Sequence, residues 1–137
     1  MVFAASLYLA AGFSFLIGMK RDVKLKVGGI FTGLFLLFLG GVFLIRYKTG
    51  YYGLSEQEWL DKSGVTALGD WVLPFYFLGS FLLLFLIDYR FFYVAFTSKG
   101  VSKWGLLCLT SLFNVLYLIG FAICLALVTV SLYPIWQ

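Results

Sequence analysis

The positions of the charged residues constrain this chain more than any other feature. Among 137 residues there are ten Lys and Arg and six Asp and Glu. Four runs contain none of them: residues 1–19, 27–45, 71–87 and 104–137. A helix rises about 1.5 Å per residue, so about 20 apolar residues cross the ~30 Å hydrocarbon core of a bilayer. The sequence therefore predicts an all-α integral membrane protein, a bundle of four transmembrane helices.

The expected spans are residues 1–19, 27–46, 71–97 and 104–133. Together with their short connections they form a single membrane domain over residues 1–137. Only 12% of the chain is charged, against about 25% in soluble domains. The third and fourth spans are long, about 40 and 45 Å at helical rise, so they must tilt or project beyond the membrane. So small a bundle is expected to have too thin an interior for a large cavity.

The distribution of lysine and arginine predicts the orientation. These residues favour the cytoplasmic side of a membrane. The connections after the first and third spans carry seven of them, whereas the middle connection carries three together with four acidic residues. We therefore expect both termini and the middle connection to lie outside. The net charge of +4 follows from this bias and does not indicate nucleic-acid binding.

The outer connection contains one helix signal. Ser55, followed three residues later by Glu58, has the form of a capping box, in which each side chain bonds the other residue's backbone N–H. We expect a short helix over residues 56–63 on the membrane surface, ended by Gly64. Pro74 is expected in the first turn of the third span, where a missing N–H costs little.

Small residues indicate where helices pack. In lipid, helices associate through close backbone approach and interhelical polar contacts. Small residues recur every fourth position in the first span and as two glycine pairs in the second, which predicts that these two helices pack through them. An interface between molecules is the alternative. The residues are Ser6, Ala10, Ser14, Gly18, Gly29, Gly33, Gly40 and Gly41.

Polar residues inside the spans are few. Asn114 falls about 15 Å into the fourth span, with Thr110 and Tyr117 on the same face, and Ser80 lies in the third span. An amide at this depth needs a partner on another helix. The alternative interpretation is a polar lining for a permeation path. Asp70 and Asp88 are expected at the membrane margins, so neither supplies a carboxylate at mid-depth.

Aromatic residues outside the charge-free runs are candidates for contact with a partner. Trp59 lies in the outer connection, and the stretch after residue 90 contains three phenylalanines. The simpler interpretation is that these rings pack at the lipid interface. The candidate partner-facing residues are Trp59, Phe91, Phe92 and Phe96.

No catalytic, cofactor or metal motif is found. The chain has no histidine, so His-based metal, haem and proton chemistry is excluded within it. We expect a non-catalytic membrane subunit without cofactors, whose partners are the lipid bilayer and other membrane subunits or copies of itself. The alternatives are a small oligomeric channel or transporter and a regulator or immunity-type protein. The expected location is a bacterial cytoplasmic membrane or, alternatively, an organelle membrane.

Overall fold

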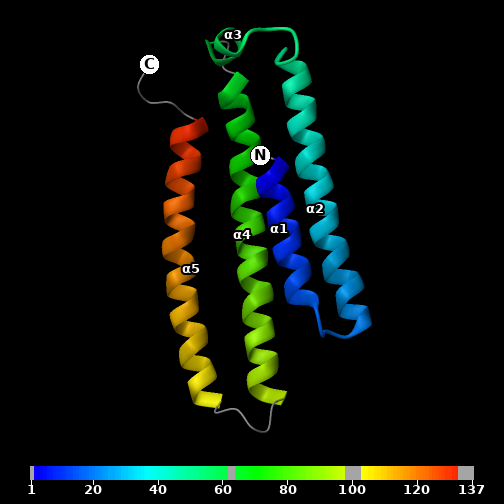
Figure 1. The fold of residues 1–137 in the computed structure, drawn as a ribbon, viewed down its shortest axis with the longest axis vertical. Helices are drawn as coiled ribbons and strands as arrows, with labels where there is room; N and C mark the ends of the chain where they lie inside the picture. The colour runs from blue at the N-terminus through cyan, green and yellow to red at the C-terminus, as the bar shows by residue number, and fades with distance from the viewer. Residues whose placement is uncertain (1, 62–63, 98–102, 133–137) are drawn as a thin grey trace.

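The computed structural model describes residues 2–61, 64–97 and 103–132, which form helices joined by turns, with no strand among them (Figure 1). The elements are α1 (Val2–Leu16), α2 (Arg21–Lys48), α3 (Glu56–Asp61), α4 (Gly64–Thr97) and α5 (Lys103–Leu132). The prediction of an all-helical chain is confirmed for these residues.

Three of the described helices are long and apolar enough to cross a membrane. They are α2, α4 and α5, with 28, 34 and 30 residues, or about 42, 51 and 45 Å. These helices indicate an integral membrane protein, as the charge-free runs predicted.

The first helix is shorter than the sequence indicated. Helix α1 has 15 residues, about 22 Å, against the ~30 Å core expected of residues 1–19. A turn ends it before the charged residues begin: Gly18 has a φ of +84°, and the N–H of Met19 bonds the Leu16 carbonyl. The charge-free run shows only that residues 1–19 are apolar, whereas the turn at Gly18 determines where the helix ends.

The helices do not form a closed bundle. Helix α4 lies in the centre, with α1 and α2 on one side and α5 on the other (Figure 1). Helix α1 packs on both α2 and α4, but within the described residues the backbone of α5 comes close to that of α4 alone. In addition, α4 and α5 extend beyond the turn that joins α1 to α2 (Figure 1).

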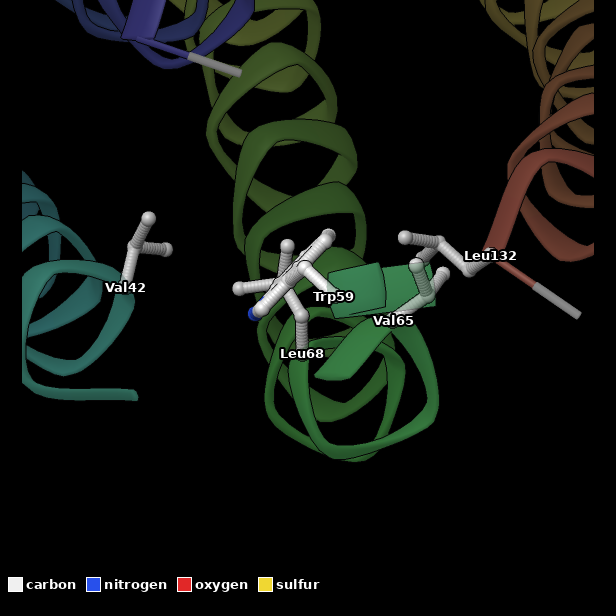
Figure 2. Close-up of a cluster of buried hydrophobic side chains, with 5 residues drawn as sticks. All are labelled: Val42, Trp59, Val65, Leu68 and Leu132. Carbon is white, nitrogen blue, oxygen red and sulfur yellow. The ribbon is translucent and has the colours of Figure 1, made fainter. Parts of the chain in front are cut away.

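Two apolar clusters hold the helices together. Near α3, Trp59 and Leu68 belong to one cluster with side chains from the neighbouring ends of α2 and α5 (Figure 2). We call this group the cap cluster; its buried members are Val42, Trp59, Val65, Leu68 and Leu132. Toward the opposite end, Leu16 of α1, Phe31 of α2 and Leu86 of α4 form a second cluster. Burying such side chains stabilises the fold mainly through close packing, since lipid is as apolar as the core.

The capping box is present at the start of α3. The Ser55 N–H donates to Glu58 Oε2 at 3.1 Å, and the Glu58 N–H donates to Ser55 Oγ at 3.4 Å. The expected stop at Gly64 is wrong, because Gly64 is the first residue of α4. The Trp59 indole packs directly on Gly64, where a Cβ would overlap the ring.

Pro74 also differs from its expected place. Because α4 begins at Gly64, Pro74 is an internal residue of the helix and removes one i→i−4 hydrogen bond. The sequence prediction began this span after Asp70, where the charge-free run starts. Helix α4 begins six residues before Asp70, and its first residues, Gly64 and Val65, are buried near the cap cluster.

Candidate functional site

Polar contacts join α4 to α5 along one face of each helix. The Tyr117 hydroxyl donates to the Ser80 carbonyl at 2.8 Å, and the Tyr76 hydroxyl donates to the Phe121 carbonyl at 2.9 Å. Tyr76 and Ser80 are four residues apart on α4, as are Tyr117 and Phe121 on α5, so each pair lies on one face of its helix. Because the two helices run antiparallel, Tyr76 lies opposite Phe121 and Ser80 lies opposite Tyr117. With the contact described next, we call this row the polar seam.

Asp88 and Asn114 form the third contact of the polar seam. Asn114 Nδ2 donates to Asp88 Oδ2 at 3.3 Å. Asp88 is not at the end of a helix, because α4 continues without interruption to Thr97. Asn114 therefore meets another helix, and its partner is a carboxylate that the sequence placed at the membrane margin.

The other polar residues of the sequence prediction also face the chain itself. Thr110 is only 4% exposed, and its hydroxyl donates to the Leu106 carbonyl at 2.8 Å. Ser80 accepts from Tyr117 through its backbone. The structure thus brings Ser80, Asn114 and Tyr117 together in the polar seam.

A groove lies on α4 between α5 and the pair α1–α2. Its volume is about 540 Å³, and four helices line it. At its floor the Tyr8 hydroxyl donates to the Gly79 carbonyl at 3.0 Å. The remaining lining is mostly apolar, with Phe38, Cys124 and Val128 among it. The sequence predicted too thin an interior for such a space; the groove exists because α5 does not reach α1 or α2.

The predicted stripe of small residues on α1 faces away from α2. Ser6, Ala10 and Ser14 are exposed, and Gly18 lies in the turn that follows the helix, where Arg90 Nη2 lies 3.0 Å from the Cβ position of that glycine. The α1–α2 contact is made elsewhere. A Cβ at Gly12 would lie 2.6 Å from the ring of Phe31, and one at Gly28 would lie 3.3 Å from Phe13.

The predicted glycines of α2 divide into two groups. A Cβ at Gly29, Gly33 or Gly40 would meet no other atom within 4 Å. At Gly41 it would overlap the Trp71 indole, whose Nε1 donates to the Phe38 carbonyl at 3.3 Å. Gly41 is thus a packing site, but against α4. Repeats of small residues could not reveal Gly12 and Gly28, because each of them receives a large ring from its neighbour.

The candidate partner-facing aromatics are in different surroundings. Trp59 is 6% exposed, and its Nε1 donates to Thr49 Oγ1 at 2.8 Å, so it belongs to the cap cluster and not to a free surface. Phe91 is half-buried, with its ring 5.9 Å from that of Phe113. Phe92 and Phe96 are exposed near the projecting end of α4.

The chemistry open to the site is limited. Among the described residues there is no group of three or more His, Cys, Asp and Glu that could hold a metal ion. Comparisons with protein-family models, with curated proteins and with solved structures found no match.

Proposed function

We propose that the protein is a non-catalytic membrane subunit that assembles with other membrane proteins, or with copies of itself, through the exposed face of α2. The observation that carries this proposal is the open space over Gly29, Gly33 and Gly40. We call these three residues the α2 glycine face.

No described side chain packs on the α2 glycine face. A glycine in a helix costs about 1 kcal/mol relative to alanine. At Gly12, Gly28 and Gly41 a close side chain offsets this cost, but no described atom does so on the α2 glycine face. Glycines at such spacing let a second helix approach the backbone closely, which supports an intermolecular contact.

The exposure of α5 also supports assembly. Apart from Thr110 and Leu132, every α5 side chain that the structure describes is half-buried or exposed. Lipid can cover such a surface, so it does not identify a partner by itself. It leaves room, however, for neighbours on the side of the molecule opposite the α2 glycine face.

A regulator that binds another membrane protein is the second candidate. Phe96 and Trp104, at the projecting ends of α4 and α5, are 67% and 79% exposed. A shared-pore channel receives less support, because Asn114, Thr110 and Tyr117 form contacts within the chain.

A substitution that adds bulk only outside the fold tests the proposal. Gly33→Leu should leave thermal unfolding of the detergent-purified protein unchanged but reduce assembly, measured by native mass spectrometry and by what copurifies. Gly120→Leu is the matched control, since Gly120 of α5 also has open space at its Cβ position. If Gly33→Leu assembles like the wild type, or if both variants lose assembly equally, the α2 glycine face is not the interface.

A further inference from the structure

Asp88 and Asn114 leave one acceptor each without a partner. Asn114 Nδ2 donates to Asp88 Oδ2, and within the described part of the chain neither side chain forms another hydrogen bond. The two remaining oxygens, Asp88 Oδ1 and Asn114 Oδ1, are buried and accept no hydrogen bond. Buried acceptors without donors are costly, and more so when one belongs to a carboxylate within an apolar hairpin.

Among the described residues, none forms an ion pair with Asp88. Arg90 follows it on α4 by two residues, so it points to a different face, and its guanidinium lies at Gly18 beyond the end of α1. The ionisable residues of α5 are Lys103, Cys108, Tyr117 and Cys124, and Tyr8 is the only one in the described part of α1. None of these residues forms a hydrogen bond or ion pair with Asp88.

Helix α2, which packs on the same side of α4 as α1, provides no compensation either. Its charged residues near the projecting end of the hairpin are all exposed, and none contacts Asp88. They are Arg21, Asp22, Lys24 and Lys26. Tyr89, next to Asp88 on α4, stacks on Tyr93. Among the residues that the structure describes, the amide of Asn114 is therefore the one hydrogen-bond partner of this carboxyl group.

We propose that Asp88 binds a proton and forms a cyclic acid–amide pair with Asn114 that holds α4 to α5. The proton comes from solvent and sits on Asp88 Oδ1, whose O–H then donates to Asn114 Oδ1. The existing bond from Asn114 Nδ2 to Asp88 Oδ2 closes the ring. One proton thus satisfies both orphaned oxygens and removes the buried charge. This proton site is independent of the α2 glycine face.

Infrared difference spectroscopy on the full chain in detergent at pH 7 tests the proton directly. Asp88→Asn is the reference, because an amide at position 88 can form the same ring with Asn114 without a carboxyl group. The wild type minus this variant should show the C=O stretch of a protonated carboxylic acid. Asn114→Leu should shift that band, because the acceptor of the O–H is removed. Ionised carboxylate bands alone in the difference spectrum would overturn the proposal.

Thermal unfolding gives a second readout. Asp88→Asn should keep the wild-type Tm, whereas Asp88→Leu should lower it or prevent folding. A Tm of Asp88→Asn as low as that of Asp88→Leu would show that the ionised form is required. If replacing sodium with choline lowers the Tm of the wild type but not that of Asp88→Asn, the site binds a cation and not a proton. Either of these two results would refute the proposal.

Discussion

A pair of glycine substitutions tests whether the structure has identified the contact between α1 and α2. The two changes are Gly12→Ala and Gly29→Ala, which add the same methyl group to adjacent helices. At Gly12 the new Cβ would lie 2.6 Å and 2.8 Å from Cδ1 and Cε1 of Phe31. At Gly29 it would meet nothing within 4 Å.

The expected difference in unfolding free energy follows from comparing the two changes. Both gain about 1 kcal/mol of helix propensity, so this contribution cancels in the comparison. Only Gly12→Ala must displace Phe31, which is 2% exposed and stacks on Tyr8 at a centroid distance of 5.4 Å, so the ring cannot turn away. Overpacking of this kind costs about 1–3 kcal/mol. Gly12→Ala should therefore be less stable than Gly29→Ala by about that amount.

Reversible unfolding of detergent-solubilised protein, titrated with a denaturing detergent, measures this difference. Gly29→Ala should be as stable as the wild type or slightly more stable. If Gly12→Ala proved as stable as Gly29→Ala, the close approach of Gly12 to Phe31 would be refuted. A loss confined to Gly29→Ala would instead favour the contact through Gly29 that the sequence pattern suggested.

Two further expectations concern the cap cluster and the orientation. Trp59→Phe removes the hydrogen bond to Thr49, which should cost about 1 kcal/mol in the same unfolding assay; an unchanged stability would show that the indole N–H does not support the cap. The seven-to-three distribution of positive residues predicts that, in a Cys108→Ser/Cys124→Ser background, an impermeant thiol reagent labels a cysteine at position 57 but not at position 23 in intact cells. Labelling at 23 alone would reverse the proposed orientation.

The membrane-protein class and the presence of three long apolar helices follow from the sequence alone. Charge-free runs of helical length predict α2, α4 and α5 because a bilayer excludes charge along about 20 residues. The capping box at Ser55 and Glu58 is equally local, since its two hydrogen bonds join residues three positions apart. The cost of an amide in hydrocarbon also indicated that Asn114 would need a partner.

Contacts between helices were decided only by the tertiary structure. Lipid and the protein interior are equally apolar, so hydrophobicity does not mark which face of a membrane helix is buried. For this reason the sequence did not distinguish Gly12, which receives Phe31, from Gly33, which faces open space. It also could not show that, among the described helices, the backbone of α5 approaches only that of α4. The pairing of Asp88 with Asn114 depends on the register of α4 against α5, which no local pattern in the chain specifies.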